Sequence, residues 1–458
     1  MKGMKVLLVC HNHPHILVGG VETYTRDLFE AFSRSPRIDP VLVARVGPPY
    51  SQMPNPHPDS PIAIMSRHSN EYLIYTDFGD FDHFFGRLRW RTPLTTHFDR
   101  FLRNIRPDVV HFQHTAYLGY DIIRIVRNAL PGVPIVYSLH DYMPICYRDG
   151  QMVRVHDNSV CQEESPRRCH ECFPTVAPQQ FFMRKRFVQS QLSLVDRFVA
   201  PTAYVKQRYV EWGIDRDKIE VEPQGVVQPS VTADEIEARR KFGPRKRNRF
   251  GYFGQLNPYK GADTLLRAID LLGPSFGGHL WVYGANLQHQ SPEWQQRFGE
   301  LIHRPRTNVT FAGSYQRSDL AELMARLDWV IVPSSWWETG PLVVWEAFQH
   351  RRPVICSDIG GQSEKVVDGV NGLHFRRGDA ESLALTLQHA ASRPGLWETL
   401  RDGIPERPGP PMSRHIDALV SIYDALLDQR NGATANAAPR AAAPHTNAVA
   451  EWRDVVSG

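Results

Sequence analysis

The stretch from Trp329 to Asp358 reads WVIVPSSWWETGPLVVWEAFQHRRPVICSD, and the rest of the chain is interpreted outward from it. An apolar run is followed by a polar loop, 342–348 has the pattern of a short helix, and 353–356 begins another strand. Glu338 lies in the loop and Glu346 in the helix. Because helical side chains tilt toward the N-terminus of their helix, the Glu346 carboxylate leans toward the loop that carries Glu338. We therefore expect both carboxylates to line one crevice.

The start of this short helix predicts the kind of ligand that the crevice would take. A helix N-terminus offers free backbone N–H groups and a partial positive charge, which together favour a phosphate group. Carboxylates beside a phosphate repel it, but they accept hydrogen bonds from sugar hydroxyls. A nucleotide-sugar carries a phosphate, a ribose and a transferred sugar, so it would satisfy all of these groups.

The spacing of the two glutamates in ETGPLVVWE, followed by AFQHRRPVICSDIGG, resembles the retaining GT-B glycosyltransferases of family 4. The resemblance implies that Glu338 contacts hydroxyls of the donor sugar and that Glu346 holds the nucleotide ribose. Pro341 stands where many members have glycine, and proline lacks an N–H donor. The resemblance places the loop that holds the donor phosphates at Gly340, Leu342 and Val343.

Alternating strand and helix patterns in both halves of the chain predict an α/β fold with parallel sheets. The resemblance implies the GT-B arrangement, in which two Rossmann-like doubly wound domains face each other across a cleft. We expect an N-terminal acceptor domain over 1–227, a linker over 228–247, a nucleotide-sugar domain over 248–411, a helix crossing back over 412–430 and a disordered tail over 431–458.

Length and composition indicate a globular protein of two domains. The chain has 458 residues, of which 42% are hydrophobic and 22% charged, and its formal net charge is +4. A charge this small, without a long basic run, predicts no nucleic-acid partner. The opening MKGMKVLLVC has too short an apolar part for a signal peptide and reads as a first buried strand. These features predict a cytoplasmic enzyme, with peripheral contact at the inner membrane face as an extension of that prediction.

Two short patterns in the N-terminal half predict the acceptor side of the cleft. Gly19 and Gly20 separate a strand from a helix, where a glycine pair lets the backbone approach a ligand closely. His114, His140 and Asp141 lie at the C-terminal ends of predicted parallel strands, where ligands of such sheets bind. His140 resembles the family histidine at the sugar-transfer site, with Asp141 fixing its orientation.

The donor domain opens with a strand, a turn and a helix in RFGYFGQLNPYKGADTLLRAIDLL. Lys260 precedes the helix, where its ammonium would neutralise the leaving diphosphate. The family often has an arginine in the turn, and this chain has Gln255 there. Gly313 closes a later strand at the ligand edge and is the expected neighbour of the nucleotide base.

Four cysteines cluster after the His-Asp pair, within an insertion over 146–172. The closing Cys-x2-Cys is half of a tetrahedral zinc site, and two further thiolates would complete a closed, structural set of four ligands. Iron–sulfur ligation, with His156 and His170 as alternative ligands, and four free thiols remain open. The predicted ligands are Cys146, Cys161, Cys169 and Cys172.

Two segments mix aromatic and basic residues, FFGRLRWR over 84–91 and FFMRKRFVQSQ over 181–191. This composition suits contact with an anionic membrane, where lipid-linked acceptors would be found. The alternative is an ordinary helix with buried aromatic rings and solvated charges.

The resemblance implies transfer of a sugar from a UDP- or GDP-linked donor to a saccharide or lipid-linked acceptor, with retained anomeric configuration and no metal cofactor for the chemistry. Lys260 and the helix start at Leu342 would stabilise the departing charge. Two alternatives stay open. A GT-B epimerase would consume donor without an acceptor, and a catalytically silent GT-B module would bind nucleotide or glycan without turnover.

Overall fold

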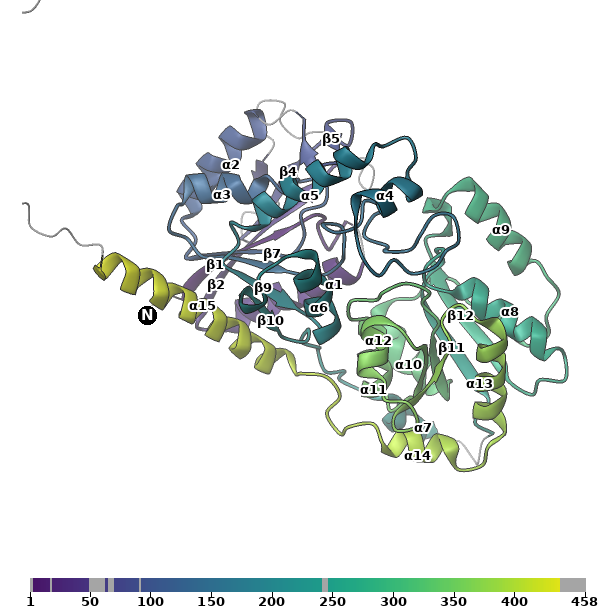
Figure 1. The fold of residues 1–458 in the computed structure, drawn as a ribbon. Coiled ribbons are helices and arrows are strands. Elements are labelled where there is room, and N and C mark those ends of the chain that lie inside the picture. The colour runs from purple at the N-terminus through teal and green to yellow at the C-terminus, as the bar shows by residue number, and fades with distance from the viewer. Residues whose placement is uncertain are drawn as a thin grey trace, which may run out of the picture.

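The computed structural model describes residues 3–16, 19–48, 62–64, 70–89, 92–240 and 246–436. Within these ranges the chain forms two α/β domains that lie side by side, with the N-terminal domain at the left of Figure 1 and the C-terminal domain at the right. Each domain is built on its own sheet.

The N-terminal sheet has eight strands in the order β10-β9-β8-β7-β1-β2-β4-β3. Its strands pair in parallel except for β3 with β4, and buried apolar runs such as VLLVC in β1 fill its centre. Its strands are β1 (Met4–Cys10), β2 (Ile38–Val46), β3 (Ile62–Ile64), β4 (Glu71–Tyr75), β7 (Val109–Phe112), β8 (Ile135–Ser138), β9 (Arg197–Ala200) and β10 (Ile219–Val221). A separate hairpin consists of β5 (Phe81–Asp82) and β6 (Arg87–Leu88).

Successive residues of β1 point to opposite faces of this sheet and so divide the domain into two hydrophobic layers. Leu7 and Val9 pack with α2, α3, α5 and α6, while Val6 and Leu8 pack with α1 and α15. The helices of the domain are α1 (Gly20–Arg34), α2 (Thr92–Ile105), α3 (Ile122–Ala129), α4 (Pro166–Cys172), α5 (Pro178–Leu192) and α6 (Ala203–Trp212), with the 3-10 turn η1 (Arg216–Lys218).

The C-terminal sheet has six parallel strands in the order β13-β12-β11-β14-β15-β16. The strands are β11 (Arg249–Gln255), β12 (His279–Ala285), β13 (Val309–Phe311), β14 (Trp329–Val332), β15 (Val354–Ser357) and β16 (Gly372–Phe375). The parallel α/β arrangement expected from the sequence is confirmed, and the order reverses between β11 and β14. Ligands of doubly wound sheets bind at such a reversal.

Helices cover both faces of the C-terminal sheet. One layer contains α8 (Ala262–Leu272), α9 (Pro292–Ile302), α13 (Ala380–Ser392) and α14 (Leu396–Asp402). The other contains α7 (Ala233–Arg240), α10 (Leu320–Ala325) and α11 (Leu342–Gln349). Helix α12 (Gly360–Lys365) follows β15, and two 3-10 turns complete the domain, η2 (Leu287–His289) and η3 (Arg317–Asp319).

The segment expected to be only a linker, 228–247, contains the helix α7. Arg352 is fully buried and its guanidinium pairs with Asp234 and Glu237 of this helix. Ala233 and Ile236 enter the adjoining hydrophobic layer. The many charged residues of 228–247 suggested a solvent-exposed linker. Because the buried Arg352 pairs with α7, this helix is instead part of the C-terminal domain. Residues 241–245, which complete the predicted linker, lie outside the described residues.

The last helix, α15 (Met412–Asn436), lies apart from the domain that precedes it in the chain and packs along the N-terminal domain (Figure 1). Tyr423 of α15 bonds His111 of β7, with 2.6 Å between the hydroxyl and Nδ1. The chain passes between the two domains twice, after β10 and again before α15. The two connecting segments are joined by a hydrogen bond from the Val226 N–H to the Pro410 carbonyl at 3.0 Å. Residues 431–436, expected in a disordered tail, belong to α15, and 437–458 lie outside the described residues. In the described part of the chain, no helix combines the length and the apolar composition that a membrane span needs.

Candidate functional site

A cleft of about 580 Å³ lies between the two domains. It opens where the carboxyl ends of both sheets meet, which is the position expected for a ligand site of this architecture. Its lining from the N-terminal domain includes Gly19, Gly20, Val21, Thr23, His140, Gln151 and Gln224. Its lining from the C-terminal domain includes Gln255, Lys260, Tyr283, Tyr315, Arg317, Trp336, Glu338, Gly340, Leu342, Val343 and Glu346.

Glu338 lies in the loop between β14 and α11 and is buried. Three donors converge on its Oε1 atom: Lys260 Nζ at 2.6 Å, Ser334 Oγ at 2.7 Å and Trp336 Nε1 at 2.8 Å. Burial raises the pKa of this carboxyl, but Lys260 and the two hydrogen bonds outweigh it and hold the pKa below its usual value. Glu338 is therefore a charged carboxylate, and among the described residues only Oε1 is engaged.

Lys260 reaches Glu338 because of the glycine that follows it. Gly261 caps α8 in the left-handed conformation, with φ 72°. A Cβ atom here would lie 1.8 Å from the Pro333 carbonyl oxygen, so the turn also requires the absence of a side chain. The close approach of the two loops places the Lys260 ammonium beside the carboxylate at the cleft.

Glu346, the second glutamate of the motif, lies on α11 and lines the same cleft, as the sequence predicts. Burial raises its pKa; Arg317 lowers it, and Asp27 raises it further. Arg317 comes from η3 and donates from Nη1 to both carboxylate oxygens of Asp27 on α1, at 2.9 and 2.6 Å. This ion pair joins the two domains across the cleft. The two glutamates thus differ, since the pKa of Glu338 is lowered and the pKa of Glu346 is raised.

One end of the cleft has an aromatic wall. Phe253 stacks on Tyr283 with 4.7 Å between ring centroids, and Tyr315 meets Phe253 edge-on at 5.3 Å. Gln255 lines the cleft nearby, but Gly313 is not among the lining residues. Gly313 is exposed, and Tyr315 two residues later takes the place beside the cleft that the sequence assigned to the glycine.

The glycine pair forms the opposite wall, as expected. Gly19 caps α1, and a Cβ atom on it would lie 2.5 Å from Glu22 Oε2. Glu22 is buried and accepts a hydrogen bond from Asn12 Nδ2 at 3.0 Å, with His11 Nε2 at 3.2 Å. Burial opposes ionisation, but these partners lower the pKa of Glu22 to about 2. A charged carboxylate therefore stands behind the loop, a feature that the sequence pattern did not indicate.

His140 lines the cleft, but its orientation is not set by Asp141. Its Nε2 lies 3.0 Å from Gln113 Oε1, and Gln224 Nε2 lies 3.0 Å from its Nδ1. Two amides therefore fix the ring, with Nε2–H donating and Nδ1 accepting. Burial lowers the pKa of His140 to about 3, so the ring is neutral at physiological pH. The prediction that Asp141 orients His140 is wrong because Asp141 is engaged elsewhere.

The partner of Asp141 is His114, whose Nε2 contacts Asp141 Oδ2. Burial opposes charge on both groups, but their pairing raises the pKa of His114 and lowers the pKa of Asp141. Neither residue is among those that line the cleft. They form a partly buried ion pair behind its wall, where we expected a contact with the acceptor.

This ion pair predicts a pH-dependent stability. Because the pKa of His114 is raised, the pair stabilises the folded protein below about pH 6.5, and this stabilisation is lost as the pH rises through the folded-state pKa. Because the pKa of Asp141 is lowered, the pair also stabilises the folded protein above about pH 4. We expect Asp141→Asn, which can still accept from the Met143 N–H, to lower the free energy of unfolding by about 2 kcal/mol near pH 5.5 and by less near pH 8.5. Urea denaturation at both pH values measures this, and an equal loss at both would contradict it.

The four cysteines of the insertion lie in one region. Burial, Glu164 and two neighbouring thiols raise the pKa of Cys169 to about 12. All four thiols are free, and no group of three or more His, Cys, Asp or Glu side chains in the described ranges is arranged to hold a metal ion. The structure thus does not gather the predicted ligand set, and zinc at Cys146, Cys161, Cys169 and Cys172 stays a prediction.

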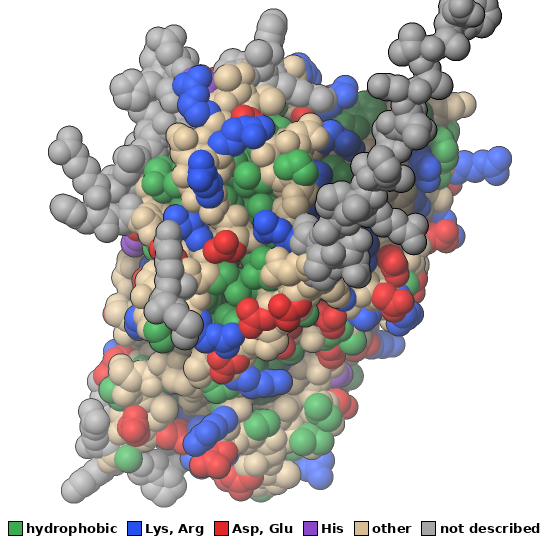
Figure 2. Space-filling model, turned by 90° about the vertical axis from the view of Figure 1, so that its left-hand side faces the viewer, with side chains coloured by type: hydrophobic (Ala, Val, Ile, Leu, Met, Phe, Trp, Pro, Cys, Tyr) green, Lys and Arg blue, Asp and Glu red, His purple; other side chains and the backbone are tan. Residues whose placement is uncertain are grey.

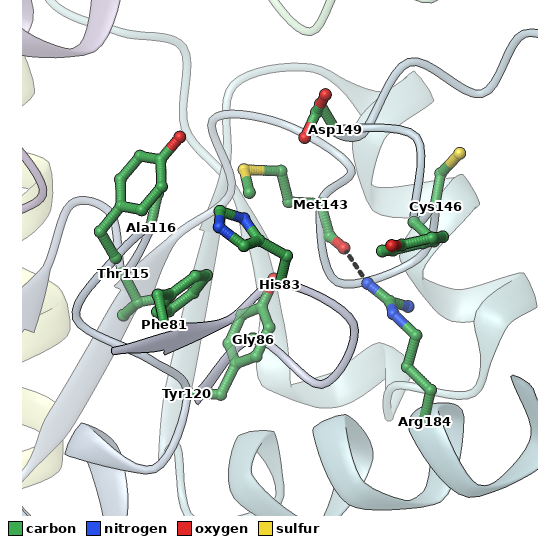
Figure 3. Close-up of a pocket in the computed structure, with 12 residues that line it drawn as sticks. Phe81, His83, Gly86, Thr115, Ala116, Tyr120, Met143, Cys146, Asp149 and Arg184 are labelled. Atoms are coloured by element: carbon green, nitrogen blue, oxygen red, sulfur yellow. Dashed lines mark hydrogen bonds between the residues drawn. The ribbon is translucent and has the colours of Figure 1, made fainter. Parts of the chain in front are cut away.

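A second, smaller cavity of about 50 Å³ lies in the N-terminal domain beside the insertion (Figure 3). The ring of His83 and the carboxylate of Asp149 belong to its lining together with Phe81 and Tyr120. The Arg184 guanidinium at its edge donates to backbone carbonyls, among them that of Met143 at 2.7 Å. The Arg184 guanidinium therefore stabilises the fold through these backbone contacts.

The segments expected at a membrane are used largely within the fold. On α5, Phe181 and Arg184 are buried, Lys185 pairs with Glu164 at 3.0 Å, and Phe182 is exposed. The face of the molecule in Figure 2 carries basic side chains in both its upper and lower parts, acidic ones mainly in its middle and lower parts, and hydrophobic side chains scattered among them. Membrane contact stays a prediction.

Comparison with known families decides the class of the protein. Residues 18–227 match the family described as Glycosyltransferase Family 4, and residues 247–392 match Glycosyl transferases group 1. The protein is a glycosyltransferase. Each match falls within one of the two domains, and the cleft lies between the two matched regions.

Curated relatives of this glycosyltransferase include a D-inositol 3-phosphate glycosyltransferase from Thermomonospora curvata, which is 26% identical over 71% of this chain and 74% of the relative. The enzyme of the same name from Stackebrandtia nassauensis is 32% identical over 56% of this chain and 54% of the relative. Glycogen synthase from Mycobacterium tuberculosis is 22% identical over 85% of this chain and 87% of the relative.

Solved structures confirm the GT-B fold of the glycosyltransferase. Anabaena HepE in complex with UDP and glucose has a TM-score of 0.63 at 17% identity, covering 92% of this chain and 99% of that one. Sucrose-phosphate synthase from Thermosynechococcus elongatus has a TM-score of 0.63 at 18% identity, covering 95% and 99%. Identities this low show the shared fold alone.

Several residues of the glycosyltransferase cleft could not be found from the sequence. Arg317 lies in a polar turn without a motif, and Trp336 has no sequence signal beyond its place in the loop before α11. Lys365 is buried behind the cleft wall against the Pro341 carbonyl, where a lysine gives no local signal of its position. Each is placed by tertiary contacts, which one sequence does not reveal.

Proposed function

We propose that this glycosyltransferase moves a sugar from a nucleotide-sugar to an acceptor hydroxyl with retained anomeric configuration. One observation carries the proposal: Lys260, Glu338, Glu346 and the start of α11 meet in a single cleft. A cation, two hydroxyl-binding carboxylates and a helix N-terminus correspond to the diphosphate, sugar and ribose of such a donor.

In this proposal the diphosphate lies against the N-terminus of α11, where the N–H groups of Leu342 and Val343 face the cleft wall. Pro341 takes the N-cap position, with φ −59°, and supplies no N–H group. Glu346 accepts from the ribose, and the aromatic wall of Tyr283 and Tyr315 receives the base. The Anabaena HepE complexes hold UDP, and a starch synthase of the same fold holds ADP, which supports a nucleotide in this position.

The chemistry that the site must support is cleavage of the bond between the sugar and the diphosphate. Negative charge develops on the departing phosphate, and the Lys260 ammonium with the α11 dipole stabilises it. Glu338 accepts hydrogen bonds from the sugar hydroxyls through the oxygen that Lys260 does not engage. The acceptor hydroxyl transfers its proton to the departing phosphate oxygen as the new glycosidic bond forms on the same face of the sugar.

The acceptor approaches from the N-terminal domain. His140 is neutral and its two nitrogens are engaged, so it orients hydroxyl groups through its neighbours Gln113 and Gln224 and takes no proton. We place a saccharide or lipid-linked hydroxyl here, in a pathway that builds a glycan, polysaccharide or glycolipid.

Thermal unfolding in the presence of UDP-glucose, GDP-mannose, ADP-glucose and the free diphosphates tests the donor site. A ligand at about 100 times its dissociation constant adds about 2.7 kcal/mol, which for a chain of this size raises the unfolding temperature by a few degrees. We expect one nucleotide to give this shift and Glu346→Gln to abolish it.

Leu385→Gln provides the control, since Leu385 is 73% exposed on α13 and does not line the cleft. No shift with any nucleotide would contradict the donor site. A shift without transfer to any acceptor, but with conversion of the donor sugar, would favour an epimerase. A shift without turnover would favour a silent binding module.

A further inference from the structure

We infer that Lys365 is a positioning residue of the donor-phosphate site, whose ammonium lies beneath the α11 N-terminus and makes nucleotide-sugar binding depend on proton uptake. The inference rests on the proposed donor site and adds to it a residue and a linkage. Lys365 is the last residue of α12, and its side chain is buried, with 9% of its surface exposed.

The position of the ammonium is defined by contacts with the donor loop. Lys365 Nζ donates to the Pro341 carbonyl at 3.2 Å, which is the carbonyl at the N-cap of α11. It lies 4.9 Å from the centroid of the Trp345 ring on the same helix. A Cβ atom built on Gly340 would lie 3.5 Å from Nζ, and Gly340 lines the cleft. The ammonium therefore lies one backbone layer behind the proposed phosphate position.

The hydrogen bonding of this ammonium is incomplete within the protein. An ammonium has three N–H donors, and among the described residues the Pro341 carbonyl is the single acceptor that Lys365 Nζ contacts. Burial with a single acceptor disfavours the charged form of Lys365 in the absence of an anion. A diphosphate at the N-terminus of α11 would supply a negative charge that offsets this penalty.

The charged groups around Lys365 come from each element packed against it. Glu338 belongs to the loop, Glu346 to α11 and Glu364 to α12, and all three favour the ammonium. The N-terminal domain contributes the neutral amide of Gln224, which also faces Gly340. Glu338 is already paired with Lys260, and Glu364 accepts from the backbone N–H groups of Ala203 and Tyr204, each at 3.0 Å. Because these two carboxylates already have partners, burial remains the main influence on the pKa of Lys365.

Burial lowers the pKa of Lys365 to about 7, in spite of these carboxylates. The loss of the ammonium proton is thus brought close to neutral pH. An arriving diphosphate raises this pKa, and Lys365 takes a proton from solvent. The affinity for a nucleotide-sugar is then greatest at low pH and falls as pH rises through neutrality.

The test is isothermal titration calorimetry of the full protein with UDP-glucose, or with GDP-mannose or ADP-glucose if the thermal panel selects one of those. The diphosphate of a nucleotide-sugar is a diester and does not titrate near neutral pH, whereas a terminal phosphate does. Binding near pH 7.5 is measured in buffers of different ionisation enthalpy, which reports the protons taken up.

We expect net proton uptake, and an affinity that falls between about pH 6 and pH 9 by about tenfold for each unit that binding adds to the pKa of Lys365. Lys365→Met should bind with the weak affinity of the high-pH protein at every pH and take up no proton there. Lys365→Arg, which stays charged, should bind without this pH dependence and restore the affinity.

Lys206→Met is the matched control, because Lys206 Nζ also donates to a backbone carbonyl, that of Ile219 at 2.6 Å, but does not line the cleft. It should behave as the wild-type protein does. Binding by the wild-type protein without proton uptake and without the pH dependence would overturn the role of Lys365 while leaving the donor site intact. Absence of nucleotide-sugar binding at every pH would instead overturn the donor site itself.

Discussion

Replacing Lys260 by methionine is expected to slow sugar transfer by about 10²–10³-fold, which is the usual effect of removing one electrostatic contact to the transition state. Lys260 is the cation in direct contact with Glu338, and the turn position where the family often has an arginine is the uncharged Gln255. In the proposed donor complex, a larger share of the charge on the departing diphosphate would therefore fall on this ammonium. Release of nucleoside diphosphate from the nucleotide-sugar measures the rate.

Removing the ammonium also leaves Glu338 buried with two hydrogen bonds and no counter-ion. A double-mutant cycle separates this loss from the loss in catalysis, with Lys260→Met, Glu338→Gln and the double variant compared in both rate and urea denaturation. We expect the double variant to recover stability but not rate. Recovery of the rate would show that Lys260 serves only to hold Glu338, and would contradict its role at the diphosphate.

Gly261→Ala is expected to lower the free energy of unfolding by about 3 kcal/mol or more and to slow transfer nearly as much as loss of Lys260. The left-handed backbone costs a non-glycine residue about 1–3 kcal/mol, and overpacking adds about 1–3 kcal/mol. The clash with the Pro333 carbonyl, at 1.8 Å from the new Cβ, must push the two loops apart. Lys260 would then move away from Glu338.

The chain offers a matched control for this substitution. Gly313 has nearly the same backbone angle, φ 74°, but no atom lies within 4 Å of the position of its Cβ. Gly313→Ala should therefore show the conformational cost alone, with little effect on transfer. Equal losses of stability in the two variants, measured by chemical denaturation, would contradict the importance of the contact with Pro333.

The fold and the centre of the site could be predicted from the sequence because they depend on local patterns. Apolar runs with intervening helical periodicity predicted two α/β domains with parallel sheets, and the spacing from Glu338 to Glu346 predicted their common cleft. Helix α7 was not predicted, because its stability comes from Arg352, more than a hundred positions away in the chain.

The predictions that failed concern side-chain partners. Asp141 follows His140 directly, which suggested that the two interact, but adjacent residues at a strand end point in different directions. Asp141 turns to His114 at the end of the neighbouring strand, and the amides of Gln113 and Gln224 take its place beside His140. Likewise, Arg317 reaches the cleft, and Lys365 the backbone behind it, only through the packing of elements distant in sequence.

The position of α15 has a consequence for the synthesis of the protein. Leu419, Val420 and Tyr423 of this helix complete the hydrophobic layer that Val6 and Leu8 begin. A ribosome makes the first sheet long before it makes the helix that covers one of its faces, and domains generally begin to fold as they emerge. The apolar face of the N-terminal sheet therefore stays uncovered until the whole C-terminal domain has been translated. During this period the exposed face is a surface that a chaperone would bind.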